Sequence, residues 1–213
     1  MDTERTEAIV LRRQPVTETS LIVTWFTRDF GKLKTMAKGA RRLKGPFQGR
    51  IDLFYRDEIA WLRSKRSALH LLVDCFLENA HAPLRGSVAT LTAASYAAEL
   101  VELATEMEDP NPKVFELLET VLTALEQGRN DGVLIWFELQ LLTVCGWGPP
   151  WDTGSGAGRI LASLAGTNLA GARRVQLTET QVRTAREELW RFWDAELGQA
   201  PRSRKWLGPE IRY

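Results

Sequence analysis

The sequence predicts an α+β protein in which a small closed β-barrel precedes a helical domain. Up to about residue 80, apolar residues occur in short runs rich in β-branched and aromatic side chains, as in strands. Beyond Pro83, apolar residues recur at intervals of three and four, as on one face of a helix. We therefore expect a barrel domain over residues 1–80 and a helical domain over residues 81–213, with an irregular insert around 146–175.

Five strand-like runs support the barrel. The clearest is Ser20–Thr27, which ends at the turn signal Asp29-Phe30-Gly31. The next run alternates, so that Lys32, Lys34 and Lys38 share one face of a strand. The other runs are residues 8–11, 52–62 and 69–77. Five short strands in 80 residues favour a five-stranded barrel of the OB type.

The helical domain begins with two apolar stripes. The first has the spacing of one helix face and consists of Tyr96, Leu100, Leu103 and Met107. Residues 109–112, Asp-Pro-Asn-Pro, break that helix. The second stripe lies within residues 114–125, and its helix should end near Gly128.

Two later helices carry cap signals. Asp131 is the expected N-cap of a helix that runs through Val144. Thr178, with Gln181 three residues on, predicts a capping box at the start of the last long helix. The Gly-, Ala- and Ser-rich stretch before that helix should hold loops and a short helix over 160–164.

The composition is that of a soluble globular protein. Of the 213 residues, 44% are hydrophobic and 26% are charged, and no apolar run reaches the length of a membrane helix. The N-terminal residues are polar, so we expect a cytoplasmic protein. In that reducing compartment Cys75 and Cys145 should be buried thiols.

The net charge of +1 hides a strong asymmetry. Residues 12–66 contain 14 lysines and arginines against 5 acidic residues, whereas residues 81–150 contain 3 against 10. Residues 151–213 are basic again, with 10 against 7. Charge divided in this way indicates one part that faces a polyanion and another part with a different task.

Catalytic and metal motifs are poorly represented. The two histidines, His70 and His81, are interpreted as structural or solvated. The cysteines do not form a Cys-x-x-Cys pair, so a zinc site lacks ligands. Residues 154–158 resemble a phosphate loop but follow a helix and lack the subsequent Lys-Ser/Thr. We therefore predict a protein that is not an enzyme, with no catalytic residues, metal or cofactor.

The basic segment from Lys32 to Arg66 is the candidate nucleic-acid site. Glycines within it let the backbone approach a ligand, and basic side chains attract phosphates regardless of sequence. Phe47, which lies in the loop, is the first choice for stacking on a base, while most other aromatic residues of the strands should pack inward. The predicted DNA-binding residues are Lys34, Lys38, Arg41, Arg42, Lys44, Phe47, Arg50, Arg63, Lys65 and Arg66.

Several phrases of the chain carry a family resemblance. They are Glu7–Arg12, Glu18–Val23, Phe30–Leu33, Lys38–Arg42, Phe47–Phe54, Leu141–Trp147 and Arg202–Leu207. In this order they resemble the RecO family of bacterial recombination mediators. Many members carry four cysteines as a zinc module after the core helix, but residues 148–154 contain no cysteine here. The resemblance therefore implies a degenerate, zinc-free module in the helical domain.

The resemblance also implies a function in DNA repair and homologous recombination. A RecO-like protein would bind single- and double-stranded DNA, anneal complementary strands, and act with RecR to load RecA onto DNA coated with the single-strand binding protein SSB. It would contact the acidic C-terminal tail of SSB. The candidate residues for that tail are Arg173, Arg174, Arg183 and Arg186.

Two other classes of function compete with this interpretation. Charge alone does not separate a DNA-binding barrel from an RNA-binding or ribosome-associated OB-fold module. An enzyme with an unrecognised site in the helical domain is a third hypothesis, which a nuclease or nucleotide hydrolysis activity abolished by one point mutation would support.

Overall fold

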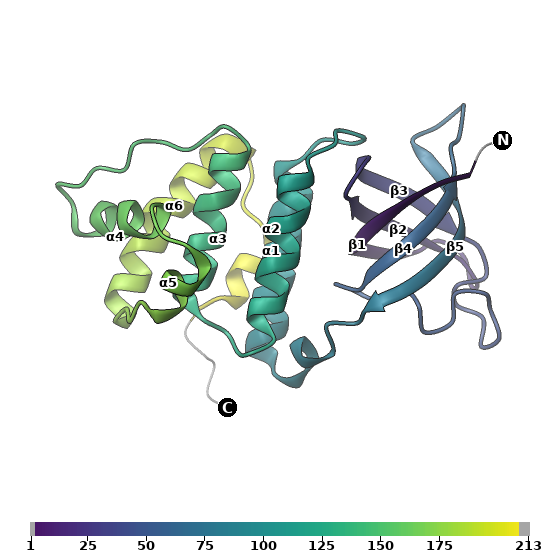
Figure 1. Ribbon diagram of the computed structural model, residues 1–213, viewed down its shortest axis with the longest axis horizontal. Coiled ribbons are helices and arrows are strands. Elements are labelled where there is room, and N and C mark those ends of the chain that lie inside the picture. Colours follow the sequence, from purple (N-terminus) through teal and green to yellow (C-terminus); the bar gives the residue numbers. More distant parts are fainter. Residues whose placement is uncertain (1–2, 209–213) are drawn as a thin grey trace. The chain divides into compact units, whose positions relative to one another are not determined.

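The computed structural model describes residues 3–208, which form five strands followed by helices (Figure 1). The strands are β1 (Thr3–Pro15), β2 (Leu21–Thr27), β3 (Gly31–Ala37), β4 (Arg56–Leu62) and β5 (Leu69–Asn79). The helices are η1 (Ala82–Gly86), α1 (Val88–Ala104), α2 (Pro112–Leu125), α3 (Asp131–Val144), α4 (Gly156–Ala165), α5 (Leu169–Arg174), α6 (Glu179–Leu197) and η2 (Arg202–Trp206). The predicted α+β class is confirmed.

The described residues divide into two compact units. The barrel unit contains the residues up to Ala82 together with Thr105–Glu119, and the helical unit contains Pro83–Ala104 and the residues from Thr120 onward. The first half of α2 therefore belongs to the barrel unit.

The strands close into a barrel in the order β1-β2-β3-β5-β4, with β3 and β5 parallel and the other pairs antiparallel. The five-stranded OB-type barrel is thus confirmed. The alternation predicted for β3 is also correct, because Leu33 and Thr35 are buried while Lys34 is exposed. Trp25 and Trp61 are fully buried in the core, and the Trp25 indole donates to Thr35 Oγ1 at 2.8 Å.

Two predicted strand limits were wrong. β1 covers 13 residues instead of the apolar run 8–11, because its polar ends pair with β2 and β4. The run 52–62 begins its strand only at Arg56. Phe54 before it has a φ of +68°, and its backbone N–H donates to Val10 O beside a bulge in β1. The residues before Arg56 therefore form a turn that pairs with β1.

Both histidines are structural. His70 is buried, its ring centroid lies 4.5 Å from that of Trp61, and its Nε2 lies 3.2 Å from Glu108 Oε1. His81 is fully buried and contacts Glu119 at 3.2 Å through Nε2.

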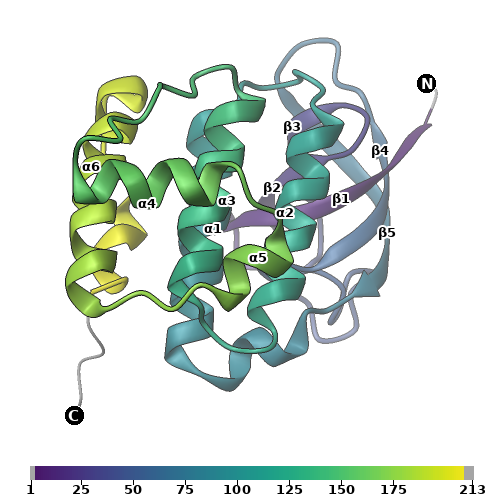
Figure 2. The same cartoon turned by 60° about the vertical axis from the view of Figure 1, so that its left-hand side comes forward.

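The helical unit is built around α3. Residues 132–139 of this helix are all buried, and most of them are apolar. This helix contacts α1, α4, α5 and α6 (Figure 2). Its N-cap is Asn130, whose side chain accepts from Val133 N, so the predicted cap at Asp131 was one residue too late. The capping box of Thr178 and Gln181 at the start of α6 is confirmed.

Two further differences concern helix limits. α1 ends at Ala104, and Met107 instead forms an isolated bridge with Lys32 in the barrel unit. The predicted short helix over 160–164 is the centre of a longer one, α4, which Ser155 caps through Gly158 N. α5 was not predicted, and Asn168 caps it in the same way. Short side chains conceal the helical spacing in this stretch.

Both cysteines are free thiols in the structure, Cys75 buried and Cys145 half-buried, and burial raises the pKa of both. A search over the described residues finds no helix with the length and apolar character needed to span a membrane.

Candidate nucleic-acid interface

The basic loop between β3 and β4 is folded by its own backbone. Arg42 N donates to Gly39 O, and Gly45 N donates to Arg42 O. Gly39 has a φ of +75°, and a Cβ at Gly45 would lie 2.2 Å from Gly39 O. Arg41 N donates to Thr19 O, which ties the loop to the β1–β2 connection. The two glycines therefore permit a tight loop in which the basic side chains are exposed.

Six of the predicted DNA-binding cations are exposed and uncommitted. Among residues 3–208, neither an ion pair nor a hydrogen bond engages the side chains of these six residues. They are Lys34, Lys38, Arg42, Lys44, Lys65 and Arg66. Lys34 lies on β3, the next three lie in or at the β3–β4 loop, and the last two lie in the β4–β5 loop. We call these six residues the open cations.

The three other predicted cations are engaged by the protein itself. Arg41 Nη1 donates to Thr17 O at 2.8 Å. Arg50 Nη1 donates to Cys75 O at 3.2 Å and lies 3.6 Å from Asp74. Arg63 pairs with Glu4 at 2.9 Å and with Glu108, and the hydrogen bond that Arg63 Nε donates to Glu4 is the largest cause of the raised pKa of Arg63.

Phe47, the residue predicted to stack on a base, is buried in this structure. Its exposed fraction is 4%, and it packs in the barrel core with Leu21 and Ile51. The loop turns this side chain inward because burying an aromatic ring stabilises the loop more than exposing it would. Trp61 and Phe54 are buried too, as predicted for strand aromatic residues.

Phe76 on β5 is an exposed aromatic residue that the sequence reasoning missed. Its exposed fraction is 47%, and the Arg50 guanidinium lies 5.9 Å from its ring centroid. The register shift between β4 and β5 at Ala60/Trp61 breaks the simple alternation of β5. A count of alternate residues therefore does not find this side chain.

Elsewhere in the barrel unit, many cations are neutralised by carboxylates. Arg5 pairs with Glu58 at 3.0 Å, and Arg28 pairs with Glu116 at 3.0 Å. Arg56 lies 3.1 Å from Glu78 and 3.4 Å from Glu119. Uncompensated positive charge is therefore concentrated on β3 and the two basic loops.

The arginines predicted to meet an acidic tail do not form one group. Arg186 is 5% exposed and pairs with Asp131 at 2.8 Å, while Arg173 donates to Ala124 O at 2.7 Å. The side chains of Arg186 and Arg173 are therefore engaged in contacts within the protein. Arg174 and Arg183 are exposed.

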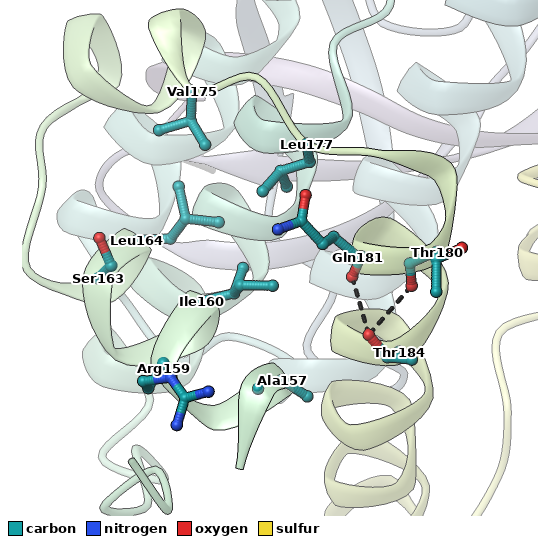
Figure 3. Close-up of a pocket in the computed structure, with 11 residues that line it drawn as sticks. Ala157, Arg159, Ile160, Ser163, Leu164, Val175, Leu177, Thr180, Gln181 and Thr184 are labelled. Carbon is teal, nitrogen blue, oxygen red and sulfur yellow. Dashed lines mark hydrogen bonds between the residues drawn. The ribbon is translucent and has the colours of Figure 1, made fainter. Parts of the chain in front are cut away.

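The helical unit also contains an apolar groove. It has a cavity volume of about 610 Å³ and lies between α4, the 175–177 connection and α6. Figure 3 shows Ile160, Leu164 and Leu177 directed into it, with Arg159 at its edge. Arg174 directly precedes the lining residue Val175, and Arg183 directly precedes Thr184.

The part of the chain that the structure describes contains no group of three or more His, Cys, Asp and Glu side chains that could hold a metal ion. The segment expected to correspond to a degenerate zinc module contains a loop, α4 and α5. These two helices contact α3, and their buried residues include Leu161, Leu164 and Ala172.

A β-barrel with OB topology that presents uncompensated cations defines a class of nucleic-acid-binding domain. Two family models match the chain, "Recombination protein O N terminal" over residues 1–78 and "Recombination protein O C terminal" over residues 85–163. The chain belongs to the RecO family of DNA repair proteins.

Individual relatives agree with this assignment. The chain is 36% identical to the DNA repair protein RecO of Rhodopirellula baltica over 143 residues, which are 67% of this chain and 53% of that protein. It is 33% identical to RecO of Syntrophus aciditrophicus over 151 residues, 70% of this chain and 58% of that protein. RecO of Salinibacter ruber is 35% identical over 151 residues, with the same coverage. The chain thus spans somewhat more than half the length of these curated relatives.

Proposed function

We propose that this protein binds single- and double-stranded DNA through its barrel and anneals complementary strands without catalysing a reaction. The observation that carries the proposal is the set of six open cations on β3 and the two basic loops. Cations without a carboxylate partner keep their full attraction for phosphates, and each phosphate contact releases counterions.

Annealing follows from the same charges. Two DNA strands repel each other through their phosphates, and a basic surface that neutralises part of this charge lowers the repulsion. Arg42 and Lys44 on one loop and Lys65 and Arg66 on the other can each bind backbone phosphates without reading sequence. The bases then remain available for pairing.

Family membership supports a proposal for the partners. The protein acts in the cytoplasm with RecR to load RecA onto DNA that is covered by SSB. The groove between α4 and α6 suits the acidic tail of SSB, because apolar side chains line it and Arg159 lies at its edge. Arg174 and Arg183 are exposed, and each directly precedes a lining residue in the sequence.

The decisive experiment reverses two open cations, in Arg42→Glu with Lys44→Glu. We expect weaker binding of a single-stranded oligonucleotide, and a slope of log K against log salt that is smaller by about 1.4, or about 0.7 for each lost phosphate contact. Fluorescence anisotropy at several salt concentrations measures both quantities.

The matched control is Arg5→Glu with Lys113→Glu, which changes the net charge of the barrel unit by the same amount. Both residues are exposed and lie outside the basic loops, and Arg5 is already paired with Glu58. We expect its salt slope to equal that of the wild type, because neither residue belongs to the proposed interface and so neither should contact a phosphate. Equal decreases of affinity and salt slope in both double variants would rule out a localised interface.

A second measurement separates DNA from RNA as the ligand. Single-stranded DNA and RNA of equal length compete for the protein in one titration. A clear preference for RNA would favour the alternative of an RNA-binding barrel, whereas annealing of SSB-coated complementary DNA strands would support the mediator function.

A further inference from the structure

A second groove opens in the barrel unit beside the basic loop. It has a cavity volume of about 520 Å³, and its lining comes from the end of β1, the start of β2 and the β3–β4 loop. Leu21, Phe47 and Ile51 line it from within the hydrophobic core of the barrel. Ala40 and Tyr55, which are half-buried, also line it.

This groove is where the barrel core reaches the surface. In the core cluster, the exposed fractions of Leu21, Phe47 and Ile51 are 8%, 4% and 6%, while each of the other buried members of that cluster is exposed by 3% or less. A flat apolar group that entered the groove would therefore contact core side chains directly. Phe47 is too buried to stack on a base at the outer surface of the barrel, but it lines the groove and would contact a group that entered it.

Two cations are fixed beside this apolar surface. Arg13 lines the groove and is held by Asp52 at 2.8 Å and by Ile51 O at 2.9 Å. Arg41 lines it as well and is held by Thr17 O at 2.8 Å. The open cations Arg42 and Lys44 follow Arg41 in the same loop. An apolar cavity thus lies within a surface that attracts phosphates.

We propose that this groove binds one unpaired nucleobase of single-stranded DNA, with the flanking phosphates on Arg41 and Arg42. This inference rests on the proposed function and adds to it a site that distinguishes single strands from duplexes. A nucleobase has two apolar faces and a polar edge, and the ion pair of Arg13 with Asp52 gives the groove lining a polar part that can face that edge.

The charge of the surroundings selects a nucleotide over an apolar peptide side chain. A peptide would need acidic residues on both sides of its apolar anchor, whereas every nucleotide of a DNA strand carries a phosphate next to its base. In a duplex the base faces are stacked and unavailable, so entry needs an unpaired base. The groove therefore contributes to single-strand binding and not to duplex binding.

The test fills the groove without changing charge, in the variant Ala40→Phe. We expect single-strand affinity to fall at least fivefold, in line with the loss of one stacked base, while duplex affinity and the salt slope stay within twofold of the wild type. Val73→Phe is the matched control, because it adds the same ring to an exposed position of β5 outside the groove. Anisotropy with a 20-nucleotide strand and its duplex gives all the affinities.

A 2-aminopurine oligonucleotide reports the base environment independently of affinity. We expect its fluorescence to change on binding to the wild type and to change less with Ala40→Phe. If circular dichroism shows that Ala40→Phe is unfolded, Leu53→Phe fills the same groove from another lining position. Equal single-strand affinity in a folded, filled variant overturns the base site and leaves the proposed function standing. If the wild type does not bind DNA at all, both the base site and the proposed function are overturned.

Discussion

The buried cations of the helical unit and the open cations of the barrel unit are used in opposite ways. In the helical unit Arg186 is buried and pairs with Asp131, and Arg204 pairs with Asp194 at 2.6 Å. In the barrel loops Arg42 and Lys44 are exposed and lack such partners within the described residues. A buried cation needs a carboxylate to offset the loss of hydration, whereas an exposed one retains its hydration and its attraction for a ligand.

The largest effect should come from removing a buried cation, in Arg186→Ala. The change leaves Asp131 with one partner fewer and removes a positive charge that faces the buried Glu138. We expect the free energy of unfolding to fall by about 3 kcal/mol, as measured by urea denaturation. The folded variant should bind single-stranded DNA as the wild type does.

The control for this loss is Arg183→Ala on the same helix. Arg183 is exposed, so its truncation should change the free energy of unfolding by less than about 0.5 kcal/mol. Similar destabilisation by both substitutions would show that the buried ion pair is not what distinguishes these two arginines.

A smaller, pH-dependent effect should arise from Glu138, a buried residue of α3 that interacts electrostatically with Arg186 and Arg204. Burial raises the pKa of Glu138 from 4.5 to about 7, although Tyr96, Arg186 and Arg204 oppose the increase. Between these two values the folded protein retains a proton that the unfolded chain has released. The contribution of Glu138 to stability is therefore fully present below about pH 4.5 and is lost as the pH rises to 7.

Glu138→Gln removes this titration. Relative to the wild type, the variant should gain stability on the order of 2 kcal/mol between pH 5 and pH 8, as measured by urea denaturation at both pH values. Glu187→Gln, which makes the same change at an exposed position of helix α6, should show no such dependence. If the difference between Glu138→Gln and the wild type does not change with pH, the carboxyl of Glu138 does not titrate in this range.

The contrast between the two regions also shows which features the sequence can predict. The charge excess of residues 12–66 and the alternation of β3 located the basic surface, because both are local properties. Ion pairing, in contrast, is not a local property of the sequence. Arg63 and Glu108 are 45 positions apart, and Arg186 and Asp131 are 55 apart, so only the fold shows that these arginines are neutralised.

The same reasoning explains why the burial of Phe47 was not predicted. A single aromatic residue among basic and glycine residues is expected on the surface, but the loop folds back over the barrel and buries it. The short helix α5 was missed because Leu-Ala-Gly-Ala-Arg-Arg has almost no apolar stripe. Its helical conformation depends on the cap at Asn168 and on packing of Ala172.

The smallest expected effect separates two neighbours in the β4–β5 loop. Arg66→Ala removes an open cation and should lower the salt slope for single-strand binding by about 0.7, with an unchanged free energy of unfolding. Arg63→Ala should leave the slope unchanged, because Glu4 and Glu108 already neutralise Arg63. Arg63→Ala should instead lower the free energy of unfolding, since the Arg63 guanidinium also lies 4.9 Å from the Trp61 ring centroid. Anisotropy at four salt concentrations and urea denaturation of both variants make the comparison. Equal slopes for Arg66→Ala and Arg63→Ala would mean that DNA displaces the carboxylates from Arg63, and that the ion pairs of the free protein do not mark the limit of its interface.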